Sequence, residues 1–597
     1  MKPEEEFRTR KEKYGLEKQS LEQKAAKLSW GRLIVFLAGF VAIYISTLFN
    51  LSVLLLTVVL FISAFLRMVY LHHKTVQKKN KAERLEEINK QELNALNHDF
   101  EAFRSGEQFQ NVEHNFSNDL NIFGAFSVFR ILNRTVTDNG EEHLSSWLKA
   151  TVGDRNEIVQ RQEATQELSG QIDLIQSFLE TGQKKRFTQE HFNKLKLWAG
   201  QANVSVSTER ILAPVFTAGS FGLIGAVVAG LLYWPVIIFW IIAGLGITAI
   251  FNKKVTEQHQ NLNNIGPSLD IIDQLTSCIN SKNYQSGILQ KQQKKLLDDE
   301  GQAPVKQLVA ILQSFDVRLN VFAAFLLNRL FLWDMHQLVR LSKWKRQFSE
   351  SLVERMEAVF CFDAFMSVGN FAYSYPGYRY PEILEKQNSG FSIAGQDCRH
   401  ILIPKEERVG NPVRLEGKGT FSIITGANMA GKSTYLRTIG LNMVLAQTGV
   451  PLDCKKFAFT PVQIISSLST RDSLVKNESF FYAEIKRLQY IIHKLENGEE
   501  VFCLLDEILK GTNSKDKQTG SIKLLRKLVK LRSNGIIATH DLKIGELENE
   551  YPNKIQNHCF EVEIKNDKLY FDYKLKDGIA QSLNASFLMR KMGITED

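Results

Sequence analysis

The chain has 597 residues, which leaves room for several domains. Lysine and arginine number 74 against 65 aspartate and glutamate residues, and a net charge of +9 is too small to identify a nucleic-acid-binding protein by itself. The six cysteines are scattered and lack the Cys-x-x-Cys spacing of a zinc site, so we expect reduced thiols and no zinc.

The N-terminal part predicts a charged helix followed by a membrane hairpin. Residues 1–30 are rich in glutamate and lysine, a pattern typical of a charged amphipathic helix. No side chain is charged from Leu33 to Leu66, and as one helix this run would extend about 50 Å, against a hydrocarbon thickness of roughly 30 Å. Divided near Asn50, it gives two passes, so residues 31–70 predict a transmembrane helical hairpin. A hairpin buried in a large soluble core is the alternative, whereas a cleaved signal peptide is excluded by the length.

The stretches on either side of a second apolar run predict helices. Residues 71–112 combine spaced leucines with many charges, which favours a solvated helix continuing out of the membrane. Residues 113–206 predict a small helical core, and residues 255–385 predict a helical lever and core segment.

The second apolar run predicts another hairpin. The stretch from Ile211 to Asn252 is uncharged and divides at Tyr233-Trp234-Pro235, which suits a turn at the headgroup level. Residues 207–254 therefore predict a second transmembrane hairpin, giving four transmembrane helices. Positive charges at both ends of both hairpins predict an integral protein of the cytoplasmic membrane with its soluble parts in the cytoplasm. These flanking charges are Lys24, Lys27, Arg32, Arg67, Lys74, Lys78, Lys79, Arg210, Lys253 and Lys254.

A phosphate-binding pattern lies in the C-terminal third. Residues 425–434 fit Gly-x-x-x-x-Gly-Lys-Ser, and we expect a strand over 421–424 and a helix over 435–445. Backbone N–H groups and the helix N-terminus would then surround the phosphates, although a glycine-rich turn that binds nothing is the alternative. Lys432 would neutralise the β- and γ-phosphates, and Ser433 would offer its hydroxyl to Mg²⁺. The residues expected to bind the nucleotide are Gly426, Ala427, Asn428, Met429, Ala430, Gly431, Lys432, Ser433 and Thr434.

Two later strands are expected to end in groups that suit the same chemistry. Residues 501–505 form an unbroken apolar run typical of a buried parallel strand, and Asp506-Glu507 follow it. Asp506 would hold Mg²⁺, and Glu507 would act as the general base for the attacking water. A third strand over 535–539 ends at His540, which would sense the γ-phosphate, although an ordinary loop histidine is the alternative. Together the motifs predict an ATP hydrolase that uses ATP and Mg²⁺.

The phosphate-binding loop, the Asp506-Glu507 pair and His540 follow one another along the chain as in the MutS-type DNA mismatch repair ATPases, which belong to the ABC ATPase class, and the chain resembles that family. The segments that carry the resemblance are Thr425–Arg437, Asp506-Glu507-Ile508, Gly511-Thr512-Asn513-Ser514, Ala538-Thr539-His540, Arg399-His400, Gly410-Asn411-Pro412 and, upstream, residues 120–168 and 357–373. The resemblance implies an α/β ABC-type P-loop ATPase domain over 386–597, preceded by an all-α core and lever region that here carries two transmembrane helical hairpins. It also implies a homodimer with composite ATP sites, in which Ser479 of the signature segment 477–481 reaches the nucleotide of the opposite subunit.

Some features depart from the family pattern. Leu509-Lys510 stand where the family has Gly-Arg, which changes the turn after Asp506-Glu507, and Glu478 brings a negative charge near a phosphate site. We expect the N-terminal part to form membrane passes where the family has its mismatch-reading domain.

Two hypotheses about function follow. In the first, a membrane-anchored MutS-like ATPase binds DNA in a role related to mismatch repair. In the second, the ATPase has lost mismatch recognition and moves or scaffolds a membrane assembly.

Overall fold

The computed structural model describes residues 2–150, 153–263, 265–298, 300–386, 390–468, 480–510, 512–565 and 568–581. Its contacts divide the chain into two compact units. The first unit comprises residues 1–102, 172–281 and 303–352, and the second comprises residues 103–171, 282–302 and 353–597. Each unit is assembled from separate stretches, so the order of segments along the chain does not by itself give the units.

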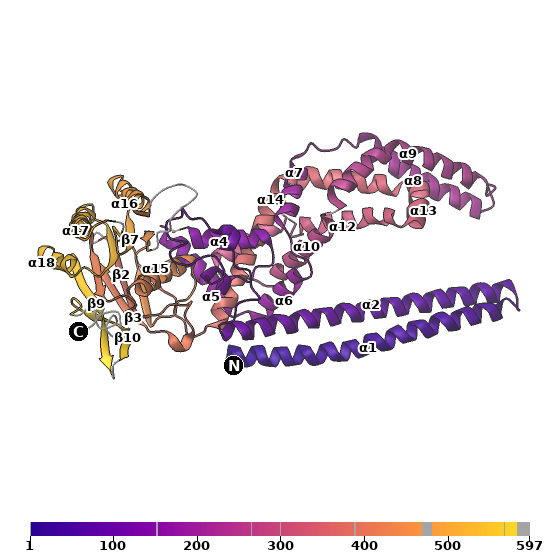
Figure 1. Ribbon diagram of the computed structural model, residues 1–597. Coiled ribbons are helices and arrows are strands. Elements are labelled where there is room, and N and C mark those ends of the chain that lie inside the picture. Colours follow the sequence, from indigo (N-terminus) through magenta and orange to yellow (C-terminus); the bar gives the residue numbers. More distant parts are fainter. Residues whose placement is uncertain are drawn as a thin grey trace. The chain divides into compact units, whose positions relative to one another are not determined.

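The first unit is helical where the structure describes it. Two long helices, α1 and α2, form an antiparallel hairpin (Figure 1). Its turn lies at residues 47–50, where the side chain of Asn50 accepts a hydrogen bond from the Val53 N–H, as expected from the predicted division near Asn50. The helices of this unit are α1 (Pro3–Ser46), α2 (Leu51–Leu96), α6 (Ile172–Gln183), α7 (Gln189–Gly200), α8 (Ser207–Val228), α9 (Val236–Asn263), α10 (Gly266–Asn280), α12 (Pro304–Asp316), α13 (Val321–Phe331) and the first part of α14 (Trp333–Ser374).

The predicted helix over 71–112 is wrong at its C-terminal end and in its solvation. Helix α2 ends at Leu96, two residues before His98 adopts a left-handed backbone conformation with φ 67°. Its polar part is not solvated all round, because Leu85, Ile88 and neighbouring residues are buried. Helix α6 packs there, and the Arg84 guanidinium lies 2.7 Å from the carboxylate of Glu180. The charges between the leucines therefore cover a packed helix.

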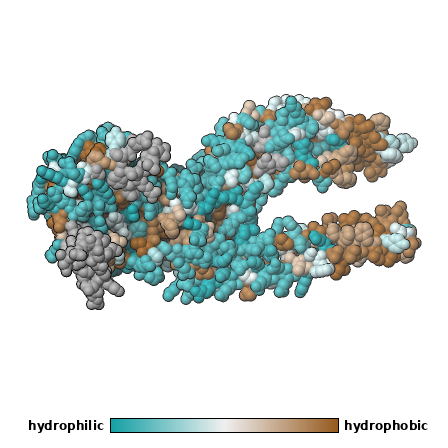
Figure 2. All heavy atoms as spheres, viewed as in Figure 1, coloured by the Kyte–Doolittle hydropathy of each residue, from teal (hydrophilic) through white to brown (hydrophobic). Residues whose placement is uncertain are grey.

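Four helices are long and apolar enough to cross a membrane among the residues described: α1, α2, α8 and α9. The turn between α8 and α9 falls at residues 229–235, where the sequence predicted it. Their most apolar 18-residue stretches are 0%, 0%, 17% and 6% buried. Figure 2 shows apolar side chains gathered over the turn-side part of each hairpin. These helices are candidate membrane spans by length and composition, and their apolar stretches are largely unburied among the residues described.

The second unit begins with a helical part in which the two upstream motif segments meet. These helices are α3 (Val128–Leu132), α4 (Asp138–Lys149), α5 (Arg155–Ser169), α11 (Gly287–Leu296) and the last part of α14. The carboxylate of Asp363 on α14 accepts hydrogen bonds from the N–H and hydroxyl of Thr137, at 2.8 and 2.7 Å. Ser367, one turn later, accepts from the Arg134 N–H and donates to the carbonyl of Leu132. Residues far apart in the sequence therefore form one polar joint.

Two sheets complete the second unit. Their strands are β1 (Glu382–Ile383), β2 (Ser392–Cys398), β3 (Asn411–Glu416), β4 (Phe421–Gly426), β5 (Lys456–Phe459), β6 (Gln463–Ser467), β7 (Val501–Asp506), β8 (Asn534–Thr539), β9 (Ile555–Lys565) and β10 (Lys568–Asp577). A four-stranded sheet has the order β1-β5-β2-β3, and a six-stranded sheet has the order β10-β9-β4-β8-β7-β6. In the larger sheet all neighbouring strands are parallel except β10 and β9.

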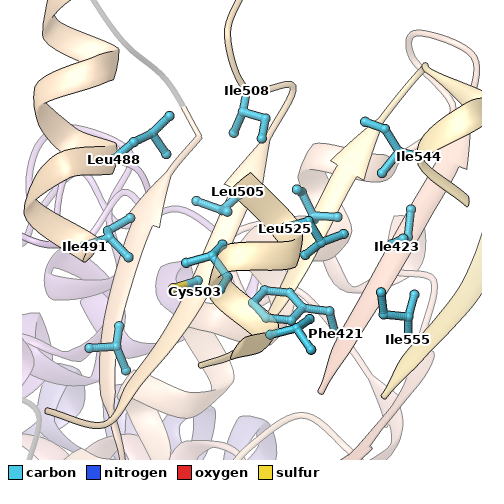
Figure 3. Packing of buried hydrophobic residues seen from close by; sticks show 14 of the residues in the cluster. Phe421, Ile423, Leu488, Ile491, Cys503, Leu505, Ile508, Leu525, Ile544 and Ile555 are labelled. Carbon is cyan, nitrogen blue, oxygen red and sulfur yellow. The ribbon is translucent and has the colours of Figure 1, made fainter. Parts of the chain in front are cut away.

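Helices α15 (Lys432–Thr448), α16 (Phe480–Glu496), α17 (Ser514–Lys530) and α18 (Leu547–Glu550) accompany the larger sheet. Strands β4, β7 and β8 are buried along their whole length, which explains why β7 is apolar from Val501 to Leu505 and why β4 and β8 are apolar at their centres. On one side, Leu488 and Ile491 of α16 and Leu525 of α17 pack against Cys503 and Leu505 of β7 (Figure 3). The strands predicted at 421–424, 501–505 and 535–539 and the helix predicted at 435–445 are confirmed.

Candidate active site

The sheet order brings three loops to one edge. Strand β8 lies between β4 and β7, with Thr425 opposite Thr539 and Asp506 opposite Ala538. Since the three strands are parallel, their carboxyl ends open on the same side, where ligands bind in open α/β sheets. The loops after Gly426, Asp506 and Thr539 therefore meet, as the sequence motifs require.

The loop after β4 has an unusual backbone conformation. Gly426, Met429 and Gly431 have φ angles of 145°, 68° and 108°, and a Cβ on Gly426 would lie 2.5 Å from the carbonyl oxygen of Phe560. Helix α15 begins at Lys432, directly after this loop. Asn428 is exposed and Met429 is 82% exposed, so the tip of the loop is accessible. Free N–H groups at the start of a helix form an anion-binding site.

Lys432 is held against this loop. Its side chain is buried, and Nζ donates hydrogen bonds of 2.8 Å to the carbonyls of Gly426 and Ala427. Burial lowers the pKa of Lys432, while the carboxylates of Glu507 and Asp506 act in the opposite direction. A buried ammonium group whose partners are neutral carbonyls has charge left over for an anionic ligand.

Ser433 and Asp506 form a pair that fits a divalent cation. The Ser433 hydroxyl donates a 2.5 Å hydrogen bond to Oδ2 of Asp506. The other carboxylate oxygen, Oδ1, is buried and has no hydrogen-bond partner within the described ranges. Burial raises the pKa of Asp506, with the Ser433 hydrogen bond opposing it. An unpartnered buried carboxylate oxygen beside a hydroxyl is the oxygen-donor set that Mg²⁺ prefers.

Glu507 and His540 lie close together. Oε1 of Glu507 is 3.5 Å from Nδ1 of His540, and Oε2 is 3.9 Å from Nζ of Lys510. Glu507 has a left-handed backbone, φ 48°, and its N–H donates to the Ala538 carbonyl at 2.9 Å. Its side chain is 20% exposed, so water reaches the carboxylate.

Sequence reasoning missed Glu484. This residue of α16 is buried, and its carboxylate accepts hydrogen bonds from the backbone N–H groups of Leu509 and Lys510, at 2.5 and 3.1 Å. Leu509 has a φ of 61°, a conformation that favours the glycine found there in the family pattern. Glu484 thus stabilises the unusual turn that follows Glu507. The only sequence signal is its position in the stripe of Leu488, Ile491 and Leu495 on one face of α16.

Helix α16 also borders the predicted signature. It begins at Phe480, so Ser479 and Glu478 lie outside the described residues. The segment before that gap is held by Asp119, whose carboxylate accepts from the Ser466 hydroxyl and the Leu468 N–H at 2.7 and 3.1 Å. Both flanks of the signature segment are therefore fixed to the second unit.

The far end of α15 contacts the helical part of the same unit. Arg161 of α5 donates to the carbonyl of Gln447 at 3.4 Å, and a Cβ on Gly449 would lie 2.5 Å from Cβ of Arg161. The next residue, Gln162, donates to the carbonyl of Pro381 at 3.0 Å. Helix α15, which starts at the phosphate-binding loop, therefore ends against Arg161 and Gln162, in the upstream segment 120–168.

Comparison with known proteins finds a match for the C-terminal part of the chain. The model of MutS domain V matches residues 422–590. Over 190 residues the chain is 33% identical to the MutS protein homolog 4 of Homo sapiens. This match covers 30% of this chain and 20% of the human protein. Over 186 residues it is 31% identical to the DNA mismatch repair protein MutS of Thermotoga petrophila, covering 30% of this chain and 23% of that protein. The chain thus spans about a fifth of the length of the curated relatives it matches. Residues 422–590 form a MutS domain V, which is an ABC-type ATPase domain.

Proposed function

We propose that this chain is a membrane-anchored ATP hydrolase in which ATP binding and hydrolysis drive a rearrangement between two copies. The observation that carries the proposal is the meeting of two elements. The buried cation of Lys432 and the hydroxyl of Ser433 lie at the start of α15, and Ser433 donates to Asp506 at the end of β7, whose second carboxylate oxygen has no hydrogen-bond partner among the described residues. This arrangement lies within the MutS-type ATPase domain.

Each residue of the site has a task in this proposal. The N–H groups of Ala427, Asn428, Met429 and Ala430, with Gly426, Gly431 and Thr434, surround the phosphates of ATP. Lys432 exchanges its two loop carbonyls for phosphate oxygens. Ser433 and Asp506 hold Mg²⁺, which when bound neutralises charge on the phosphates.

The proton is handled by the neighbouring pair. Glu507 accepts a proton from the attacking water, since its carboxylate is solvent-accessible and held in a fixed turn. His540, 3.5 Å from Glu507, hydrogen-bonds the γ-phosphate and orients that carboxylate. Both groups belong to loops that the parallel sheet fixes relative to the phosphate loop.

A second copy completes the site in this proposal. Ser479 of the partner subunit would contact the nucleotide, as the family resemblance implies. Helix α16 begins one residue after Ser479, and its Glu484 holds the turn next to Glu507. Contact between two copies at the start of α16 would therefore reach the general base through two hydrogen bonds.

The anchor is the pair of apolar hairpins. The exposed stretches of α1, α2, α8 and α9 fit four membrane-spanning helices, with the charged flanks on the cytoplasmic side. DNA is the second candidate partner, because the relative from Thermotoga petrophila is a DNA mismatch repair protein. In the alternative role, the membrane assembly replaces DNA as the load.

ATPase measurements on the full chain in lipid nanodiscs test the proposal. Lys432→Ala should abolish ATP binding, whereas Glu507→Gln should bind ATP with Mg²⁺ and not turn over. Normal hydrolysis by Glu507→Gln would show that another group is the base. Homoduplex, mismatched and branched DNA are then added across a salt series. Salt-sensitive binding and stimulation support the role in DNA repair, and their absence favours the membrane load.

A further inference from the structure

Helix α13 is a short apolar helix that the sequence did not single out. Its eleven residues include one charged side chain, Arg329. Val321 and Phe322 are 84% and 75% exposed, and Phe325 and Leu326 are also exposed. Positions 321, 322, 325 and 326 share one face of a helix. This face is an apolar surface of the kind that marks a protein or membrane contact.

The helices on either side of α13 return in the same direction. Trp333 Nε1 donates to the carbonyl of Ser314 at 2.8 Å, and Trp344 Nε1 donates to that of Pro304 at 2.9 Å. Helices α12 and α14 therefore run antiparallel, side by side. Helix α13 joins their ends and is bent by 107° from α12 (Figure 1). Helix α13 connects the neighbouring ends of α12 and α14 and is not a continuation of α12.

The C-terminal part of α13, from Arg329 to Phe331, packs on the second hairpin. Arg329 donates a 2.7 Å hydrogen bond to the hydroxyl of Thr248 on α9, and a Cβ on Gly244 would lie 2.1 Å from the carbonyl oxygen of Arg329. The rings of Phe331 and Phe221 are 5.2 Å apart. These partners lie within the uncharged run of α8 and α9. The exposed face of α13 is thus continuous with the apolar surface of that hairpin.

The break between α13 and α14 is satisfied by protein groups. Leu332 is left-handed, φ 49°, and the carbonyls of Leu330 and Phe331 accept hydrogen bonds from the hydroxyls of Ser220 and Thr217 on α8. The N–H of Asp334, the second residue of the next helix, donates to the side chain of Asn328 at 2.8 Å. Backbone groups need such internal partners where no water reaches them, as in a bilayer.

We infer that α13 is inserted in the membrane without crossing it, with its exposed face among the lipid acyl chains of the leaflet nearest the charged ends of α8 and α9. This inference rests on the proposed membrane anchoring. At its start, Arg318 donates to Asn252 and Thr256, next to the charged end of α9. At its end, the contacts with Gly244 and Ser220 lie further along the hairpin toward its turn. Helix α13 therefore slopes from the headgroups into the hydrocarbon.

The insertion would couple the bilayer to a long helix. A single residue, Leu332, separates α13 from α14, and α14 continues without interruption to Ser374, passing Asp363 and Ser367. A change in the depth of α13 would act directly on the first turn of α14. The lipid is thus the partner that this surface fits.

Spin labels on single cysteines of the full chain in nanodiscs test the inference. The six native cysteines are replaced by serine or alanine, and a label is placed at Phe322→Cys, on the exposed face of α13. Phe239→Cys, at an exposed position of α9, is the reference for lipid, and Gln313→Cys, at an exposed position of α12, is the reference for water. We expect the label at position 322 to collide with oxygen in preference to a water-soluble nickel complex, several-fold more than at position 313 and close to position 239.

Three other results would contradict the inference in different ways. If position 322 behaves like position 313 while position 239 reports lipid, α13 is not inserted although the anchor is. If positions 322 and 239 both report water, the membrane anchoring itself fails. If neither reagent reaches position 322, a protein surface or a second copy covers α13, and lipid is the wrong partner.

Discussion

Glu484 should control turnover through the position of Glu507, and its replacement gives a quantitative test. The Glu484 carboxylate accepts two backbone N–H groups, and hydrogen bonds to a charged group contribute about 1.5–3 kcal/mol each. Leu509 also bears a left-handed conformation, which costs roughly 1–2 kcal/mol in a non-glycine residue. We expect Glu484→Ala to weaken the turn by on the order of 3 kcal/mol, and hence to lower kcat by about 100-fold if that loss reaches the transition state.

The assay separates turnover from binding. ATP affinity should stay near that of the native chain, because the Lys432 and Ser433 contacts are untouched. Glu484→Gln keeps one acceptor oxygen and should lose less activity, and adding Leu509→Gly should restore part of it, since glycine adopts the left-handed conformation readily. Glu496→Gln is the matched control, because Glu496 lies on the same helix in an exposed ion pair. An unchanged kcat in Glu484→Ala would refute the reasoning, and so would a loss of ATP binding equal to the loss of turnover.

Three further predictions concern charge in the second unit. Asp506→Asn should weaken Mg²⁺-dependent ATP binding by roughly 10–100-fold. Burial raises the pKa of Asp506, and Mg²⁺ needs the ionised carboxylate, so ATP binding by the native chain should weaken as pH falls through that raised pKa. A pH titration of ATP binding should show this dependence for the native chain and not for the variant. Burial lowers the pKa of His400 from 6.5 to about 4, so the unfolded chain takes up a proton at this residue first. The free energy of unfolding should therefore fall by about 3 kcal/mol as pH drops from 6.5 to about 4. The melting temperature of His400→Gln should depend less on pH over this range, and a pH dependence equal to that of the native chain would contradict the assignment. Asp363→Ala removes the acceptor of Thr137 and should cost about 3–5 kcal/mol in denaturant unfolding, while Asp363→Asn should cost less.

The geometry of the phosphate site follows closely from the sequence. A strand buried on both faces is mostly apolar, and β7 is apolar from Val501 to Leu505 and buried along its whole length. Parallel strands end at the same edge, so a loop after Gly426 and a carboxylate at Asp506 are brought together once both strands are identified. The 2.5 Å hydrogen bond between Ser433 and Asp506 is what this logic requires.

Glu484 was not predictable in the same way. An acidic residue in an amphipathic helix normally marks the solvated face, and nothing local distinguishes one that is buried. Its partners are backbone N–H groups, which carry no sequence signature. The departure at Leu509 showed that the turn was unusual, but only the structure identifies the carboxylate that stabilises it. The end of α2 at Leu96 has a similar cause, since the left-handed His98 that follows has no compositional signal.

Helix α13 was not predicted from the sequence because membrane segments are recognised by the length of an apolar run. A span needs about 20 apolar residues, and a helix of eleven falls short of it whatever its composition. Thr217 and Ser220 look like ordinary small polar residues within the apolar run of α8. In the folded chain their hydroxyls bind the carbonyls of Phe331 and Leu330, more than a hundred residues away. The polar residues of one apolar helix are therefore explained by the interrupted backbone of another, and that relation becomes visible only when both are placed in space.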